Sequence, residues 1–113
     1  MKQLLTMLAL ISALGWQLPV RAAASDAQLA AIAEMGRLNG IALQCRYLEQ
    51  VQRIKKVLVL NLPKERALGD WFEQKTNASF MDFMSRQANC PGLLEFDREL
   101  DRAEKQLESA FKQ

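Results

Sequence analysis

The chain of 113 residues contains only two cysteines, Cys45 and Cys90, and they constrain its fold more than any other residues do. They are too far apart for C-x-x-C redox chemistry, and the chain has no histidine with which they could complete a zinc site. Because two cysteines in an exported protein usually pair, we predict one disulfide bond between them. In the chain-entropy model, closing such a loop stabilises the folded state by roughly 4 kcal/mol.

The start of the chain is the reason to expect export. Lys2 precedes an apolar run over residues 4–14, and the segment ends with Pro19 and a run of three alanines. This pattern is typical of a secretory signal peptide, with cleavage after Ala24 or, alternatively, after Ala22. A membrane anchor is the less favoured interpretation, because a spanning helix needs about 20 apolar residues. We therefore expect a periplasmic or secreted protein without a stable membrane anchor.

Cleavage after Ala24 divides the chain into a signal peptide, residues 1–24, and one small domain, residues 25–113. The leader carries two of the 15 basic residues and none of the 13 acidic ones, so the mature domain is formally neutral. A neutral domain gives no electrostatic reason to expect nucleic acid as a partner. A domain of this length has room for one modest hydrophobic core.

A first helix is expected to begin at Ser25 or Asp26. Ser25 and Gln28 match a capping box, and apolar residues then recur at helical spacing. Gly36 and Gly40 form a G-x-x-x-G pattern within this segment. We favour the interpretation that the two glycines let another helix approach closely; a break in the helix near Gly40 is the alternative.

Residues 41–60 repeat apolar side chains with a period near 3.6 and predict an amphipathic helix. Its last apolar residues could also form a strand, but the sequence offers no second strand for it to pair with. The basic residues Arg53, Lys55 and Lys56 lack interleaved aromatic residues, so we expect a solvated helix face rather than an anion contact. Pro63 should then end this helix and occupy the first position of the next one.

Residues 64–87 predict a helix that carries four of the seven aromatic residues of the mature domain. Such a concentration is more typical of a core than of a ligand site, because each aromatic side chain buries a large area. If Phe80, Met81, Phe83 and Met84 do not all fit inside, the surplus is expected to form an exposed patch for a partner.

Residues 93–110 show the strongest helical pattern in the chain, with apolar residues three and four positions apart and charged residues on the other faces. We favour packing of this face within the chain; a homodimer through the C-terminal helix is the alternative. The predicted fold class is therefore all-α, a small domain of three to four helices closed by one disulfide after a cleaved signal peptide.

The sequence carries no catalytic signature. Without histidine it lacks the usual general base and the commonest metal ligand, and it contains no glycine-rich phosphate loop. Glu95, Asp97, Glu99 and Asp101 alternate with arginines, which is typical of a solvated helix surface. We therefore expect no enzyme activity, no cofactor and no metal.

Three stretches carry a resemblance to known proteins: residues 36–45, residues 76–80 and Cys90-Pro91. With them the chain resembles small exported bacterial proteins, some of which are accessory or host-killing proteins of the Kik type, encoded beside the transfer genes of conjugative plasmids. This resemblance covers residues 36–91 and implies a link to conjugation or type IV secretion, with no catalytic residues to transfer. In outline alone, the chain is also similar to HdeA-type periplasmic acid-stress chaperones, which are small, helical and closed by one long disulfide loop.

These observations predict a small non-enzymatic binding or accessory protein that meets a protein partner in the cell envelope. The candidate surface is the region of Phe80, Met81 and Met84, or a groove beside Gly36 and Gly40. An acid-stress chaperone is one alternative, and an immunity or inhibitor protein is another. Against the chaperone, a chain without histidine should change little between neutral and mildly acidic pH.

Overall fold

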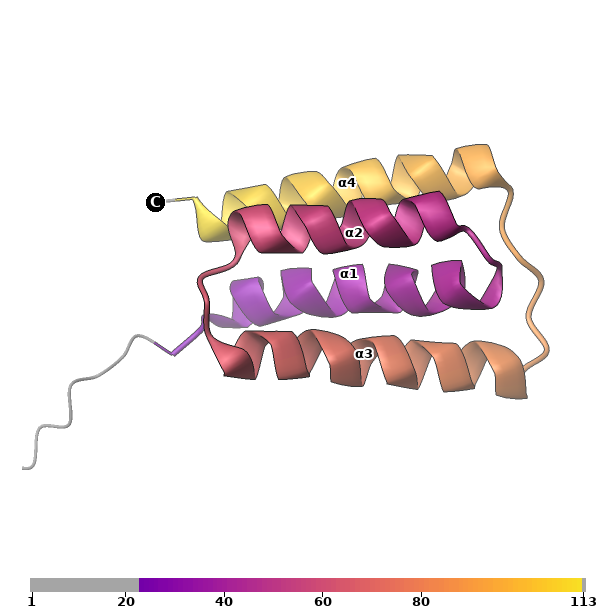
Figure 1. Cartoon of the computed structure of the whole chain (residues 1–113), viewed down its shortest axis with the longest axis horizontal. Coiled ribbons are helices and arrows are strands. Elements are labelled where there is room, and N and C mark those ends of the chain that lie inside the picture. The colour runs from indigo at the N-terminus through magenta and orange to yellow at the C-terminus, as the bar shows by residue number, and fades with distance from the viewer. Residues whose placement is uncertain (1–22, 113) are drawn as a thin grey trace, which may run out of the picture.

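The computed structural model describes residues 23–112, and these residues form four α-helices without a strand. The helices are α1 (Asp26–Gln44), α2 (Leu48–Asn61), α3 (Arg66–Ser85) and α4 (Leu93–Phe111). Consecutive helices run in opposite directions (Figure 1). The prediction of an all-α domain is thereby confirmed. The predicted signal peptide falls on residues 1–24, of which residues 1–22 lie outside the described part of the chain.

The predicted start of the first helix is also confirmed. Ser25 is the N-cap residue of α1, and its hydroxyl oxygen accepts a hydrogen bond from the backbone amide of Gln28 at 3.1 Å. The side chain of Gln28 in turn accepts from the backbone amide of Ser25 at 2.9 Å. This reciprocal pair satisfies two amides that a helix start leaves without an intrahelical partner.

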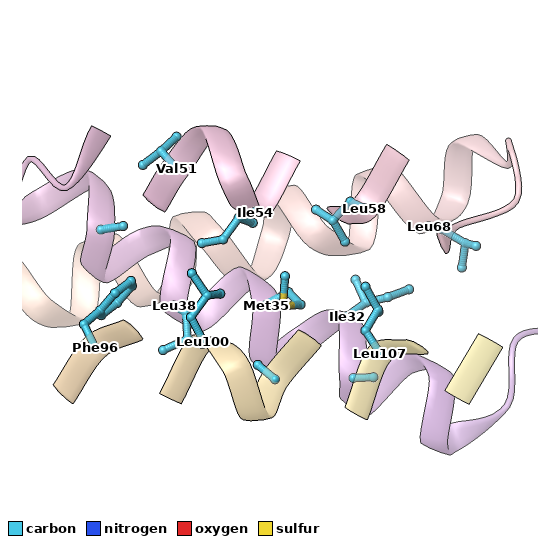
Figure 2. Close-up of a cluster of buried hydrophobic side chains, with 13 residues drawn as sticks. Ile32, Met35, Leu38, Val51, Ile54, Leu58, Leu68, Phe96, Leu100 and Leu107 are labelled. Atoms are coloured by element: carbon cyan, nitrogen blue, oxygen red, sulfur yellow. The ribbon is translucent and has the colours of Figure 1, made fainter. Parts of the chain in front are cut away.

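The hydrophobic core lies between α1, α2 and α4 (Figure 2). Its buried side chains are Ala31, Ile32, Met35, Leu38 and Ala42 of α1, Val51, Ile54 and Leu58 of α2, Leu68 of α3, and Phe96, Leu100, Ala103 and Leu107 of α4. The residues that α4 buries stand three and four positions apart, as its pattern predicts. The interpretation that α4 packs its apolar face within the chain is therefore confirmed.

The two glycines of the G-x-x-x-G pattern lie where α3 crosses α1. An ideal Cβ atom on Gly40 would come within 2.7 Å of the backbone nitrogen of Phe80 and of the carbonyl oxygen of Thr76. A Cβ atom on Gly36 would come within 2.7 Å of the Cβ atom of Lys75. The glycines thus let the backbone of α3 lie directly against α1, which confirms the interpretation of a close helix contact. α1 continues past Gly40 without a break.

α3 packs against α1 and has no Cα atom within 8 Å of α2 or α4. Polar groups hold the two helices together without any ion pair between them among the described residues. The side-chain donors are Trp71 Nε1 to the carbonyl oxygen of Leu29 (2.9 Å), Ser79 Oγ to that of Arg37 (2.7 Å), Gln44 Nε2 to that of Phe80 (3.3 Å), and Asn39 Nδ2 to Thr76 Oγ1 (3.2 Å). The α1–α3 contact therefore contains no ion pair for acid to break.

The prediction that the aromatic residues of this region fill the core is wrong. Leu68 is the one residue of α3 in the fully buried hydrophobic cluster. Trp71 and Phe72 pack partly against that cluster, and Phe80 and Phe83 are half-buried. The close contact at the glycines is the reason, because the backbone of α3 lies against α1 along the middle of their interface. Large side chains can then pack only along its edges.

The predicted helix over residues 41–60 is divided between α1 and α2. Arg46 adopts the left-handed backbone conformation, with φ 59°. The amide of Tyr47 donates to the carbonyl oxygen of Ala42 at 2.9 Å, which is the long hydrogen bond of a Schellman motif. The motif places Cys45 at the end of α1. Since neither glycine nor proline stands at this point, the sequence carries no strong breaking signal there.

Pro63 lies in the connection between α2 and α3, so the prediction that it occupies the first position of the next helix is wrong. α3 begins at Arg66, with Glu65 as its N-cap residue. The carbonyl oxygen of Pro63 accepts from the amide of Glu65 at 2.8 Å, which makes a tight turn before the helix. The strand alternative for residues 57–60 is not adopted, because these residues belong to α2.

α3 ends in a second Schellman motif, in which Gln87 adopts φ 49° and the amide of Ala88 donates to the carbonyl oxygen of Phe83 at 3.1 Å. Because glycine reaches this conformation without a steric penalty, Gln87→Gly is expected to raise the free energy of unfolding by about 0.5–1 kcal/mol. Urea unfolding followed by circular dichroism measures the change. Gln74→Gly, at an exposed position inside α3, is the control and should lower it by about 1 kcal/mol. If both variants are destabilised, Gln87 does not have the left-handed conformation assigned to it.

Candidate functional site

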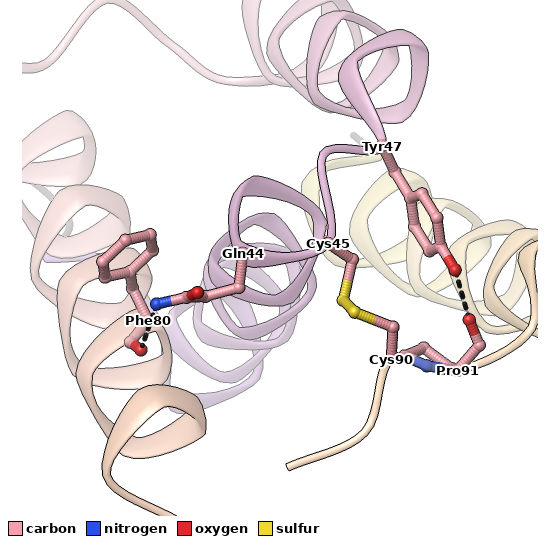
Figure 3. The surroundings of a disulfide bond; sticks show 6 residues. All are labelled: Gln44, Cys45, Tyr47, Phe80, Cys90 and Pro91. Carbon is pink, nitrogen blue, oxygen red and sulfur yellow. Dashed lines mark hydrogen bonds between the residues drawn. A yellow bond between two sulfur atoms is a disulfide. The ribbon is translucent and has the colours of Figure 1, made fainter. Parts of the chain in front are cut away.

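The predicted disulfide is confirmed: Cys45 and Cys90 are bonded, and their Cα atoms are 5.7 Å apart. Cys45 caps the C-terminus of α1, and Cys90 lies in the connection between α3 and α4 (Figure 3). The bond therefore joins α1 to the segment that leads from the outlying helix α3 back to the core helix α4. It lies at the end of the bundle where α1 and α3 end and α2 and α4 begin (Figure 1).

Tyr47 adds a second link at this end of the bundle. Its hydroxyl donates a hydrogen bond to the carbonyl oxygen of Pro91, the residue after Cys90 (Figure 3). The Tyr47 ring also packs edge-on against Phe96 of the core, with 5.6 Å between the ring centroids. The connection between α3 and α4 is thus held by one covalent bond and one hydrogen bond, side by side.

Exposed apolar side chains lie at the same end of the bundle as this link. Six of the eight exposed large hydrophobic side chains in the described part of the chain lie in the terminal turns of the four helices nearest to the disulfide. They are Leu43 of α1, Leu48 of α2, Met81 and Met84 of α3, and Leu93 and Leu94 of α4. We call these six residues the disulfide-end surface. Large exposed apolar groups that share one region of a small protein often mark an interaction site.

The structure separates the predicted partner-surface residues into two groups. Met81 and Met84 are 56% and 50% exposed, so they remain accessible as surplus apolar side chains. Phe80 is half-buried beside Gln44. Gly36 and Gly40 are buried under α3, which fills the space that a partner helix would need. The space directly over the two glycines is therefore occupied within the chain itself.

Sequence reasoning missed Leu43, Leu48, Leu93 and Leu94 as surface residues. The spacing of Leu43, Leu48 and Leu93 fits the apolar faces of α1, α2 and α4, so periodicity assigned them no separate role, whereas Leu94 falls outside the apolar stripe of α4. All four stand in the terminal turns of their helices, at the end of the bundle that holds the disulfide. Exposure of this kind depends on where helices stop, which is the least certain feature of a sequence pattern.

The acidic residues of α4 pair with arginines of two other helices. Arg53 of α2 forms a two-pronged interaction with Glu104, at 2.6 Å from Nε to Oε1 and 3.0 Å from Nη2 to Oε2, and also binds Asp101. Arg37 of α1 donates to Glu99 at 3.1 Å. The carboxylate surface predicted on α4 is solvated at Asp101, whose side chain is 57% exposed, but the ion pairs that these carboxylates form with α1 and α2 were not predicted.

These contacts shift the pKa values of Asp101 and Arg53. The hydrogen bond from Arg53 holds the pKa of Asp101 below its ordinary value of 3.8. The hydrogen bond with Glu104 is the main cause that raises the pKa of Arg53. A carboxyl group whose pKa is lowered by folding stabilises the folded state above its unfolded pKa, and this contribution disappears as the pH falls through the folded value.

We therefore expect the free energy of unfolding to stay nearly constant between pH 7 and about pH 5, and to fall below about pH 4. Urea unfolding across this range measures the profile. Arg53→Gln removes the cause of the Asp101 shift, so the stability difference between wild type and this variant should shrink below about pH 4. Arg86→Gln breaks an exposed pair within α3 and is the control. A stability transition between pH 5 and pH 7 would contradict this account.

The described residues contain no group of three or more histidine, cysteine, aspartate or glutamate side chains that could hold a metal ion. No helix within residues 23–112 combines the length and the apolar character needed to cross a bilayer. The structure does place the disulfide-end surface at the same end of the bundle as the disulfide and the Tyr47–Pro91 hydrogen bond. This arrangement can bind another apolar surface.

In comparisons of the chain with protein-family models, curated proteins and solved structures, nothing matched.

Proposed function

We propose that this chain is a small non-enzymatic binding protein of the periplasm, which meets a protein partner of the cell envelope through the disulfide-end surface. The observation that carries the proposal is that six exposed large apolar side chains lie at the end of the bundle that holds the disulfide. A soluble domain of this size gains nothing in stability from exposing them together. Apolar side chains that share an exposed region are instead typical of surfaces that bind other proteins.

The disulfide and the Tyr47–Pro91 hydrogen bond favour a binding surface whose backbone is already rigid before the partner binds. Leu93 and Leu94 follow directly after the segment that the disulfide and the Tyr47–Pro91 hydrogen bond hold in place. Met84 precedes the same segment at the end of α3. Fixing these backbone positions before binding reduces the ordering entropy lost on association. An oxidised, exported chain is therefore the form expected to bind.

The resemblance to small exported proteins encoded beside plasmid transfer genes supports a more specific proposal. We expect the partner to be a protein of the envelope machinery of conjugation or type IV secretion. The partner would present an apolar patch with few charges at its centre, because the disulfide-end surface offers leucine and methionine side chains. Methionine adapts to irregular partner surfaces, so Met81 and Met84 are expected to contribute directly.

Affinity capture from the periplasm of cells that carry the transfer system tests the proposal. The oxidised protein at neutral pH is expected to retain one dominant, stoichiometric partner. Met84→Asp should lose it, because a charge would be buried in an apolar contact. Ser109→Asp introduces the same charge in the last turn of α4, far from the disulfide end, and should keep it. Absence of a partner at neutral pH, with many unrelated clients in acid, would overturn the proposal and favour the acid-stress chaperone.

A further inference from the structure

A second apolar surface lies away from the disulfide end, between α2 and the first half of α3. The Cα atoms of these two helices stay more than 8 Å apart, and a groove of about 620 Å³ lies between them. Apolar side chains of both helices and of their connection line it: Leu58, Val59, Leu62, Pro63, Leu68 and Phe72. We call this feature the α2–α3 groove. Val59 on its wall is 80% exposed, so the groove is open to solvent.

An open groove of this shape suits a protein surface better than a small molecule. Small-molecule sites enclose most of the ligand, whereas here one wall ends in an almost fully exposed valine. α2 has 14 residues, which gives a helix about 21 Å long at 1.5 Å per residue. A helix of another molecule could lie against such a wall over several turns, in the helix-in-groove mode.

The charges on the two walls indicate which protein would fit. Lys55 stands on the α2 wall and Glu73 on the α3 wall, and both line the groove. Neither forms a salt bridge with another described residue. A two-fold axis that runs along the groove, midway between its two walls, would place the α2 wall of each copy against the α3 wall of the other, with Lys55 beside Glu73 of the second copy. This is the self-complementarity that an isologous interface requires.

Two further observations favour a second copy over a different partner. The groove also contains charged residues of both signs: Lys64, Glu65 and Arg66. Its charge therefore gives no preference for a strongly acidic or strongly basic partner. The domain after the leader is formally neutral, so two copies do not repel each other through net charge. In contrast, the apolar face of α4 is used within the chain, where Phe96, Leu100 and Leu107 are buried.

We infer that two copies of this chain form a symmetric dimer through their α2–α3 grooves, with Lys55 of each copy paired with Glu73 of the other. The dimer leaves the disulfide-end surface of both copies free, since the two sets of residues do not overlap. The inference is therefore independent of the proposed function, and a failure of one does not entail a failure of the other.

Adjacent residues of α2 provide the first test. Val59 lines the groove, whereas the next residue, Leu60, is 72% exposed and does not line it. The oxidised protein, purified after export, is expected to show a concentration-dependent dimer in analytical ultracentrifugation. Val59→Glu should weaken association at least roughly tenfold, because it places a charge in the apolar contact, and Leu60→Glu should leave it unchanged. Both positions are exposed, so neither variant disturbs the core.

A charge exchange provides the second test and identifies the occupant. Lys55→Glu alone and Glu73→Lys alone each place like charges opposite one another and should weaken the dimer roughly tenfold. The combined variant restores opposite charges and should restore the dimer. Lys105→Glu with Glu108→Lys, an exposed pair on α4, is the matched control and should have no effect. A monomer at all concentrations, a dimer that Leu60→Glu disrupts, or a combined variant without recovery would each overturn the inference.

Discussion

Replacing Cys45 and Cys90 together with alanine is expected to lower the free energy of unfolding by roughly 3–4 kcal/mol. The disulfide closes a loop with a sequence separation of 45, for which the chain-entropy model gives roughly 4 kcal/mol. For a domain of this size, whose total stability is on the order of 5–10 kcal/mol, this is a large fraction. Urea unfolding of the oxidised protein and of the double variant, followed by circular dichroism, measures the difference.

Two controls separate the bond from its surroundings. Wild type treated with a reductant should unfold at the same urea concentration as the double variant, because both lack the loop closure. Tyr47→Phe removes only the hydrogen bond to Pro91 and should lower the free energy of unfolding by about 1 kcal/mol. If the double variant proves as stable as the oxidised protein, the disulfide does not carry the stability assigned to it here.

The bond has a particular importance in this fold because, among the described helices, only α1 brings its Cα atoms within 8 Å of those of α3. Without the disulfide, the α3–α4 connection would be held at Tyr47 by one hydrogen bond. We expect α3 and its connection to exchange amide protons faster than α1 in the double variant, since their contacts are fewer. The disulfide-end surface would then lose its fixed geometry, because Met84, Leu93 and Leu94 lie on either side of the connection.

Local patterns in the sequence were sufficient for much of the fold. The apolar spacing of α4 predicts both its helical form and its buried residues, since a stripe with one covered face follows directly from the helical period. The Ser25–Gln28 capping box predicts the start of α1, because both hydrogen bonds lie within one turn. The disulfide follows from elimination, as the chain has two cysteines and no other use for them.

The position of the core depends on which helices approach one another, and the sequence does not specify that. The aromatic residues of α3 suggest a core helix, yet α3 lies outside the main core because Gly36 and Gly40 bring its backbone against α1. The G-x-x-x-G pattern indicates a close contact without naming the partner helix. Had α3 been identified as that partner, its large side chains could have been placed at the edges of the contact.

Contacts between residues that are far apart in the sequence likewise leave no local sequence pattern. Arg53 belongs to a run of basic residues that is typical of a solvated face, and its carboxylate partners lie about 50 positions further along the chain. The boundary between α1 and α2 was missed because Arg46 adopts a left-handed conformation that glycine normally supplies. In both cases tertiary structure overrides the local preference of the residues.

The location of the ion pairs also bears on the acid-stress alternative. Acid removes the α4 pairs with Arg53 and Arg37, whereas α3 is held to α1 by polar groups without an ion pair. Protonation would therefore loosen α4 before it loosens α3. A chaperone of this design would expose the core face of α4, with Phe96 and Leu100, and would require a pH below about 4.

Gly40→Ala is expected to lower the free energy of unfolding by about 2 kcal/mol, although alanine is the better helix former. A Cβ atom at this position would lie 2.7 Å from two backbone atoms of α3 and from the Cβ atom of Ser79. Backbone atoms cannot rotate away as a flexible side chain can, so α3 must shift as a whole. Overpacking typically costs 1–3 kcal/mol, and because backbone atoms are involved we expect the upper end of about 3 kcal/mol, from which the gain of about 1 kcal/mol in helix propensity is subtracted. Urea unfolding measures the net change.

Gly69→Ala is the matched control, because Gly69 also lies inside a helix but has no atom within 4 Å of an added Cβ. This variant should raise the free energy of unfolding by about 1 kcal/mol through helix propensity alone. Gly36→Ala should fall between the two, since its closest neighbour is the Cβ atom of Lys75 and its nearest backbone atom is at 3.0 Å. The free energy of unfolding should therefore be highest for the alanine variant at Gly69, lower at Gly36 and lowest at Gly40, in the order in which α3 comes closer to the glycine. Equal stabilisation at all three positions would show that α3 does not lie against α1 at the glycines.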